Sequence, residues 1–499
     1  MDKIRIFYAD FLDSLTDGER ATLRAFFTDF DQYFDTSSSE RRRFREDFEM
    51  AIIALHSRGV PVEEITERLA LSNLGGYYAR PSVLWFPLDN SAKIYPISMD
   101  HGTQNLFRIS VYFKEDILPE VMQIALTFTV KRFPAFATSL KKGVFWHYLD
   151  SVKCRFSLTE EHDVPCQPIK VSISGSSSFR LLYYKNRVSA EFFHVLTDGT
   201  GGTVFIKALA AEYLRLMGVK VSSTEGHDLW NINDTPTRDE FENAFERIER
   251  TKGSSGFIDR PATQMNGKLS VRRPCRILHL KMPTDALLSA ARSYGATVTV
   301  YLLTLMFLAA SAATDELSGE LSIQVPVNMR KFYETRTVRN FAMYCGIRMA
   351  ISDIGDKDDM VRAITSQLEQ KASKESMQEM ISASVKLVSA LRCIPLVIKQ
   401  PVARRVCGFL GEKIFSTTLS NLGVVTLPEE LSEHIESMDF CLGAPEHNRL
   451  ACAAISFGGV TTFSITKNTP DPTFEEKMLS LLSEDGIETR VEGSEFYER

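Results

Sequence analysis

The sequence predicts an α/β (α+β layered) protein built from two halves of similar layout, with a helical extension at the N-terminus. Three observations predict this fold class. Residues 106–217 run in the order strand, helix, strand pair, hairpin and helix, which is the order of an α/β layered unit. Residues 275–330 begin a second series with strand, helix, helix and strand. Between the two series, residues 231–274 lose the apolar periodicity and gain charged, Gly and Ser residues, as a connecting segment does.

The length of 499 residues is too great for one ordinary hydrophobic core. We therefore expect a helical extension over residues 1–75, a first half over 80–230, a crossover linker over 231–274 and a second half over 275–499. Within the crossover, the run Lys-Gly-Ser-Ser-Gly at 252–256 predicts a flexible stretch.

Residues 1–75 carry the start signals of several helices. Thr16 and Ser37 each precede a Glu by three positions, the spacing of a capping box. A third helix over 62–71 could be mistaken for part of a helix-turn-helix. However, residues 1–75 contain 10 basic and 15 acidic residues, and an acidic unit is a poor ligand for DNA. We interpret this part as a helical extension packed on the main body.

Apolar periodicity assigns the elements of the main body. The expected strands cover residues 106–113, 137–148 (a pair that turns at 141–143), 180–184, 188–193, 275–282, 321–330, 416–423, 451–457 and 460–466. The expected helices cover residues 115–132, 203–217, 284–294, 297–313 and 473–482. The uncharged run in the fourth helix is about 16 residues long, and a membrane span needs roughly 20. We interpret that helix as buried in the core.

Composition excludes several classes of function. Hydrophobic residues make up 44% and charged residues 24% of the chain, as in ordinary soluble globular proteins. The net charge of −6 does not favour nucleic acid as a partner. The eight cysteines are scattered without metal-ligand spacing, which predicts no metal site and suits a reducing compartment. The first residues lack the apolar core of a signal peptide. We expect a cytoplasmic protein without a transmembrane segment.

One histidine stands in an unusual place. His194 follows the predicted hairpin strand, and the residues behind it, Val-Leu-Thr-Asp-Gly-Thr-Gly-Gly, lead into a predicted helix. Glycines at these positions let the backbone bend tightly and approach other groups closely. A lone histidine at a strand end is more often structural, and we interpret His147, between two aromatic residues, in that way. Asp198 and Gly199 behind His194 favour a functional interpretation.

The pattern His-x-x-x-Asp-Gly at 194–199 resembles the signature of the CoA-dependent acyltransferase superfamily, which includes chloramphenicol acetyltransferase, alcohol acetyltransferases, wax-ester synthases and condensation domains. Other segments resemble the family in the same order. These are Arg-Phe-Pro at 132–134, the paired helices at 287–302, Pro-Val-Asn-x-Arg at 326–330 and Asn-Phe at 340–341. Many members carry two histidines in tandem, and here Phe193 fills the first position.

The resemblance implies two chloramphenicol-acetyltransferase-like subdomains with the active site at their interface, where His194 faces a channel open at both ends. It implies that His194 is the general base. Asp198 would pair with Arg330 and fix the loop that holds the base, and Gly199 would allow a backbone conformation or a close approach. Ser420 and Asn421, in a strand that the family places beside its channel, are candidate oxyanion donors, although ordinary turn chemistry explains them equally well.

The resemblance also implies the reaction partners. We expect no permanently bound cofactor, an acyl-CoA or phosphopantetheine thioester as co-substrate, and a small alcohol or amine as acceptor, with an acyl carrier protein as a further partner left open. Two alternatives stay open beside an alcohol-acetyltransferase-like enzyme. One is a carrier-protein-dependent condensation enzyme that forms amides. The other is a degenerate, non-catalytic binding module of the same fold.

Residues 380–411 contain five basic residues and no acidic residue, among many apolar ones. The basic residues are Lys386, Arg392, Lys399, Arg404 and Arg405. The simplest interpretation is a solvated face of a packed helical pair. The alternatives are a docking site for a CoA phosphate or an acidic carrier protein, and a peripheral contact with a membrane surface.

Overall fold

We describe a computed structural model of the whole chain. The described residues are 2–34, 37–70, 72, 85–89, 92–93, 96, 105–151, 155–169, 176–251, 259–401 and 412–497. The predicted flexible stretch at 252–256 and the basic residues Arg404 and Arg405 lie outside them.

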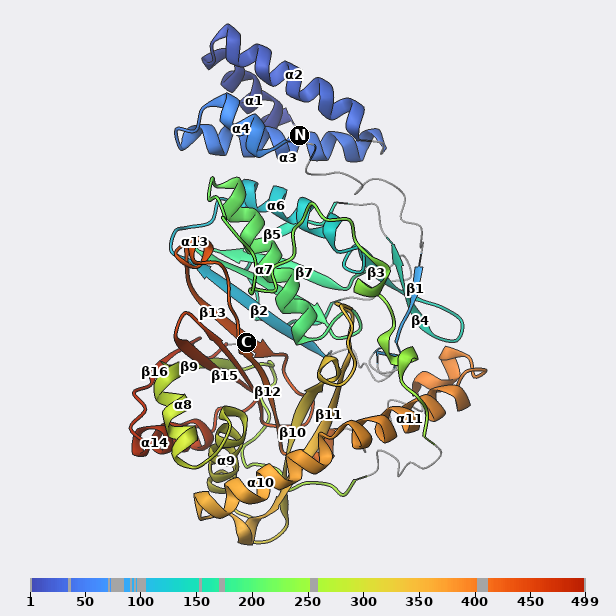
Figure 1. Cartoon of the computed structure of the whole chain (residues 1–499), viewed down its shortest axis with the longest axis vertical. Coiled ribbons are helices and arrows are strands. Elements are labelled where there is room, and N and C mark those ends of the chain that lie inside the picture. Colours follow the sequence, from blue (N-terminus) through green and yellow to red (C-terminus); the bar gives the residue numbers. More distant parts are fainter. Residues whose placement is uncertain are drawn as a thin grey trace.

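The described residues of the N-terminal extension form four helices. They are α1 (Asp2–Ser14), α2 (Asp17–Tyr33), α3 (Ser38–Ser57) and α4 (Val62–Arg68). The capping box predicted at Thr16 is present, since its side chain and that of Glu19 bond each other's backbone amides. The four helices lie at one end of the molecule, against α6 (Figure 1). An ion pair between Asp47 of α3 and Arg155 fastens them to the first half.

The first half is a five-stranded sheet covered by two helices. The sheet has the order β13-β2-β8-β7-β5. Its strands are β2 (Leu106–Phe113), β5 (Leu158–Glu160), β7 (Phe179–Tyr184), β8 (Arg187–Phe193) and β13 (Ile435–Leu442). The helices are α6 (Pro119–Arg132) and α7 (Gly199–Leu216). A small sheet beside them has the order β1-β4-β3-β6, from β1 (Trp85–Pro87), β3 (Thr138–Lys142), β4 (His147–Ser151) and β6 (Ser176–Ser177).

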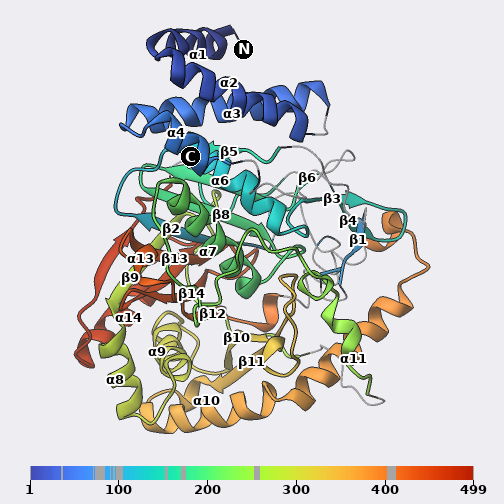
Figure 2. The same ribbon diagram turned by 45° about the horizontal axis from the view of Figure 1, so that its top comes forward.

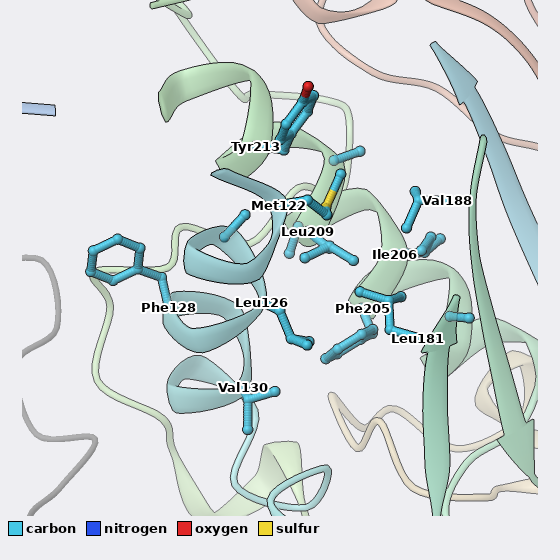
Figure 3. Close-up of a cluster of buried hydrophobic side chains, with 14 of the residues drawn as sticks. Met122, Leu126, Phe128, Val130, Leu181, Val188, Phe205, Ile206, Leu209 and Tyr213 are labelled. Carbon is cyan, nitrogen blue, oxygen red and sulfur yellow. The ribbon is translucent and has the colours of Figure 1, made fainter. Parts of the chain in front are cut away.

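Helix α6 is buried on both sides, which explains its weak amphipathic pattern. Its residues Met122, Leu126 and Val130 lie on the side of α7 and the sheet, where Phe205 and Leu209 also point (Figure 3). Phe128 points the other way, and α3 of the extension packs on α6. The extension therefore covers apolar surface that the first half would otherwise expose to water.

The second half is a seven-stranded sheet with the order β11-β10-β12-β14-β15-β9-β16. Its strands are β9 (Arg276–Pro283), β10 (Glu320–Asn328), β11 (Ala342–Ala350), β12 (Thr417–Val424), β14 (Leu450–Phe457), β15 (Val460–Lys467) and β16 (Arg490–Gly493). Its helices are α8 (Thr284–Ser293), α9 (Val298–Ala312), α10 (Lys357–Lys371), α11 (Lys374–Ala390) and α14 (Thr473–Glu484). A short helix, α13 (Glu429–Ser432), precedes β13.

The prediction of a buried core helix is confirmed, since Val300–Phe307 of α9 are all buried. Among the described residues, no single helix is long and apolar enough to cross a membrane. The pair of α8 and α9, bent by 80°, meets the length and composition criteria together.

The second half contributes one strand to the sheet of the first half. β13 lies late in the chain, yet it pairs antiparallel with β2 at the edge of the first sheet, from Ile435 opposite Phe113 to Leu442 opposite Phe107. It also touches the second sheet, where Thr462 Oγ1 donates to the Met438 carbonyl at 3.1 Å. The halves are therefore joined by main-chain pairing as well as by the crossover, and periodicity did not predict β13.

Two boundaries in the first half's α6 and its β3–β4 turn differ from the prediction, each for a local reason. α6 begins at Pro119 rather than at 115, because proline is favoured in the first turn, where its missing N–H is not needed. The turn between β3 and β4 lies at 143–146 rather than at 141–143, because Lys142 still pairs with His147.

A buried ion pair fastens the crossover to α6. Arg132 is 1% exposed, and its guanidinium donates to the two carboxylate oxygens of Glu240 at 2.5 Å and 2.9 Å. Its Nε donates to the Asn231 carbonyl at 3.0 Å. Arg132 of the Arg-Phe-Pro segment thus binds the crossover at two points, Asn231 and Glu240.

Glu240→Ala should lower the free energy of unfolding by about 3–5 kcal/mol, because it leaves the buried Arg132 charge without its carboxylate. Urea denaturation measures this. The control is Arg362→Ala, which removes one partner of an ion pair exposed on both sides and should change stability by no more than about 1 kcal/mol. Equal effects of the two substitutions would contradict the anchoring role.

Candidate active site

His194 lies directly after β8, at the contact between the two halves. Its backbone N–H donates to the Asn105 carbonyl at 3.0 Å, which extends the pairing of β8 with β2 by one residue. Its carbonyl accepts from Asn340 Nδ2 at 3.1 Å, a bond that comes from the second half. The residue is half-buried, and its ring lies 5.1 Å from the Phe107 ring, centroid to centroid. Both halves therefore hold the backbone of His194, and Phe107 of the first half packs beside its ring.

Asp198 joins the His194 loop to the second half. Its Oδ2 accepts from Arg330 Nη1 at 2.8 Å and from the Phe341 backbone N–H at 2.6 Å. Its Oδ1 accepts from the Gly201 N–H at 3.0 Å and so caps α7. The predicted ion pair between Asp198 and Arg330 is thus confirmed. Both side chains are largely withdrawn from water, so the pair has little solvent screening.

Arg330 is held from several sides. Its Nη2 donates to the carbonyls of Thr337 and Arg339, both at 2.8 Å, and its Nη1 also donates to Asn328 Oδ1 at 3.2 Å. The same Asn328 donates from Nδ2 to Thr200 Oγ1 at 3.2 Å. The turn between β10 and β11 therefore closes around the guanidinium and presents it to Asp198 in one orientation.

The glycines after Asp198 allow α7 to lie close to the second half; they are not needed for a bend in the backbone. Helix α7 begins at Gly199, not at 203 as predicted, because the Asp198 carboxylate caps it there. A Cβ at Gly201 would lie 2.1 Å from the Val338 carbonyl oxygen, and one at Gly199 would lie 2.4 Å from Leu422 Cδ2. Neither glycine has a positive φ. The absence of a side chain is what lets α7 start against the second half.

Burial lowers the pKa of His194 below the usual 6.5, because the charged ring loses its hydration. The negative charge of Asp198 and the residue's own backbone carbonyl act in the opposite direction, but burial is the largest cause. At neutral pH the imidazole is therefore uncharged and able to accept a proton.

The two oxyanion candidates on β12 differ in their surroundings. Asn421 donates from Nδ2 to Thr299 Oγ1 at 3.1 Å and accepts from the Gly423 N–H at 2.9 Å, so its side chain is engaged by α9 and by its own turn. Ser420 is half-buried and lies on β12 just before an irregular stretch of the strand that includes Leu422, whose side chain lies where a Cβ at Gly199 would be. An oxyanion role stays a prediction for both residues, and the Ser420 side chain is not engaged in the contacts that hold Asn421.

Periodicity and the signature did not identify Asn340 and Thr197 as part of the site. Asn340 holds the carbonyl of His194, and Thr197 Oγ1 donates to the Val338 carbonyl at 2.6 Å. The only sequence signal for the turn between β10 and β11 was the Asn-Phe pair at 340–341, which resembles the acyltransferase family. By contrast, His147 is packed in β4 as expected. Burial, with the charges of Lys142 and Lys399, lowers its pKa to about 4.

The channel expected beside His194 stays a prediction. One cavity of about 130 Å³ lies between the crossover and α11, and Phe245, Ile248, Ile381 and Val385 are among its lining residues. His194 does not line it. No group of three His, Cys, Asp or Glu side chains that could hold a metal ion occurs in the part of the chain that the structure describes.

No protein-family model matches the sequence, and a search of curated proteins finds no match. Solved structures do match. Polyketide synthase associated protein 5 from Mycobacterium tuberculosis is 13% identical with a TM-score of 0.56, covering 81% of this chain and 98% of that one. TRI101 from Fusarium sporotrichioides, solved with coenzyme A and T-2, is 11% identical with a TM-score of 0.55, covering 80% and 97%.

The trichothecene 15-O-acetyltransferase TRI3 from Fusarium sporotrichioides is 11% identical with a TM-score of 0.54, covering 80% of this chain and 94% of that one. At such identities the likeness establishes the fold. The chain has the two-subdomain, chloramphenicol-acetyltransferase-like fold of the CoA-dependent acyltransferases, as the sequence resemblance predicted. The comparisons do not assign a substrate or the roles of the site residues.

Gly201→Ala should destabilise the protein by about 1–3 kcal/mol, because the new methyl group overlaps the Val338 carbonyl and forces the halves apart. The matched control is Gly18→Ala in α2, where no atom lies within 4 Å of the added carbon. That change should be neutral or stabilise by up to about 1 kcal/mol. Thermal and chemical denaturation of both variants test this, and a neutral Gly201→Ala would refute the close approach.

Asp198→Asn should destabilise by about 3 kcal/mol, near the lower end for a broken buried ion pair, since Thr337 and Arg339 still hold the guanidinium. The control is Asp163→Asn, whose partner Arg272 is also solvent-exposed. It should have almost no effect. Urea denaturation is the measurement, and similar stability losses in the two variants would contradict the role given to Asp198.

Proposed function

We propose that the protein is an acyltransferase that moves an acyl group from a CoA thioester to an alcohol or amine acceptor, with His194 as the general base. One observation carries this proposal. The His194 imidazole stands half-buried at the contact between the halves, in a loop held by the Asp198–Arg330 pair, and burial lowers its pKa. A base needs a position shielded from bulk water and a ring that is neutral at the working pH.

In the proposed reaction, the neutral ring of His194 takes the proton of the acceptor hydroxyl or amine as its oxygen or nitrogen attacks the thioester carbonyl. The resulting tetrahedral intermediate carries a negative oxygen, to which the Ser420 hydroxyl is our candidate donor. When the carbon–sulfur bond breaks, the imidazolium returns its proton to the departing CoA thiolate. Free CoA and the acylated acceptor are released, and His194 is neutral again.

Asp198 has a positioning role in this scheme. Its two oxygens accept from Gly201, Arg330 and Phe341, so the carboxylate is occupied in holding the loop. The nearby negative charge also favours the imidazolium that forms during the reaction. No nucleophilic Ser or Cys is required, and the acceptor attacks the thioester directly.

The names of the structural neighbours support the choice of co-substrate. TRI101 was solved with coenzyme A and T-2, and TRI3 is named a trichothecene 15-O-acetyltransferase. For the present chain, a CoA thioester and a small hydroxyl or amine acceptor are proposals. Phe193 replaces the first histidine of many relatives and is fully buried, so the reaction must proceed with one histidine. Carrier-protein thioesters belong in the same assay as alternative donors.

His194→Ala should abolish acyl transfer and leave the fold intact. Release of free thiol from a panel of acyl-CoA donors, with alcohols and amines as acceptors, measures the activity. The expected loss is about 10²–10⁴-fold in turnover, the usual contribution of a general base. The control is His162→Ala, an exposed histidine that should leave turnover unchanged. An active His194→Ala protein, or an acyl adduct trapped on Ser or Cys, would refute the mechanism.

The rate should depend on pH through His194. Because burial lowers the pKa of His194, the neutral ring persists to below the usual value of about 6.5. The rate should therefore be level near neutral pH and fall only as the pH drops through that lowered pKa. A pH profile of turnover measures this, and an acid limb centred above 7 would contradict the assignment of His194 as the base.

A further inference from the structure

Two segments that are far apart in the sequence meet beside the small sheet and project together from the molecule. One is the β3–β4 turn at 143–146, and the other is the segment 391–401 that follows α11. The Leu396 N–H donates to the Val144 carbonyl at 2.8 Å and joins them. The β3–β4 loop and the end of the orange segment after α11 lie side by side at the edge of the molecule in both views (Figures 1 and 2).

The projection carries apolar side chains that face solvent. We define the apolar tip as Val144, Phe145, Leu387, Val397 and Ile398, whose exposed fractions are 71%, 44%, 48%, 68% and 59%. Val144 and Phe145 come from the turn and the other three from α11 and its extension. Most remaining exposed large apolar residues stand singly, such as Val271 and Leu317. A group of five in two adjoining segments is different, because contiguous exposed apolar surface marks an interaction site.

The charged side chains on the two segments that form the tip are basic, and the next acidic residue of the hairpin, Asp150, is paired with Lys141. Lys142, Lys386 and Arg392 are exposed beside it. Neither residues 138–149 nor residues 380–400 contain an acidic residue. Lys399 is buried, with its ammonium 3.3 Å from the centre of the Trp146 ring and donating to the Leu391 carbonyl at 3.2 Å. This inner contact ties the turn to the segment, so the tip is a fixed surface rather than two independent loops.

We propose that the apolar tip and its basic surround bind the surface of a bilayer that contains anionic lipids. Aliphatic and aromatic side chains would enter the boundary between headgroups and acyl chains, and the three basic side chains would lie at the level of the headgroups. Each basic residue near such a surface strengthens binding about fivefold. A protein partner fits less well, since protein interfaces are depleted in Lys. This contact is independent of the reaction proposed above.

The test is co-sedimentation of the full chain with vesicles. One set contains phosphatidylcholine alone, and the other contains equal parts of phosphatidylcholine and phosphatidylserine. The protein should bind the anionic vesicles and bind neutral ones at least about tenfold less, with the difference lost at high salt. The double variant Phe145→Asp/Ile398→Asp should lose binding by more than about tenfold. Lys386→Ala/Arg392→Ala should lower it about 25-fold on anionic vesicles only.

The control is Val271→Asp/Leu317→Asp, which adds two charges at apolar positions elsewhere that are even more exposed than Phe145 and Ile398 and should bind as the unaltered protein does. Circular dichroism and the melting temperature check that all variants fold, and thiol release checks that activity is retained. Failure of the folded protein to bind anionic vesicles would overturn the proposal. So would equal losses in the tip variant and the control, or capture of an acyl carrier protein by the tip in preference to vesicles.

Discussion

The ion pair between Asp198 and Arg330 is the contact on which the rest of the site depends. A carboxylate buried at the start of α7 is stable only if its charge and lone pairs are matched. The second half supplies the match with the Arg330 guanidinium at 2.8 Å and the Phe341 N–H at 2.6 Å. The same turn reaches the carbonyl of His194 through Asn340. The same turn of the second half therefore docks the two halves and holds the backbone of His194.

The pair also dictates the residues around it. The halves approach so closely at α7 that a side-chain carbon at 201 would overlap the Val338 carbonyl. Glycine is therefore required for contact, while the helix itself is nucleated by the Asp198 cap. His194 lies at the same contact between the halves, where burial lowers its pKa. The close packing at Gly201, the start of α7 at the Asp198 cap and the lowered pKa of His194 thus all belong to this one contact between the halves.

The sequence predicted the local elements well and the long-range ones poorly. β2 and the hairpin of β14 and β15 were found nearly residue by residue, because their apolar patterns and turn glycines are local signals. β13 was missed, since its partner β2 lies more than 300 residues away and its pattern is not distinctive. At the candidate site, the His-x-x-x-Asp-Gly pattern singled out His194 and Asp198, the Pro-Val-Asn-x-Arg segment singled out Arg330, and the predicted ion pair between the two charged residues is present. The role of Asn340 depends on which carbonyl the fold brings to it, and no spacing in the chain encodes that.

A double-mutant cycle on Asp198→Asn and Arg330→Gln tests the central claim most directly. The unfolding free energy and the turnover of the two single variants and the double variant are compared. If the pair holds the halves and the histidine together, the second substitution should add little to the first, with a coupling of about 1–3 kcal/mol. The same non-additivity should occur in turnover. Additive losses in both quantities would contradict the claim, because each side chain would then act on its own.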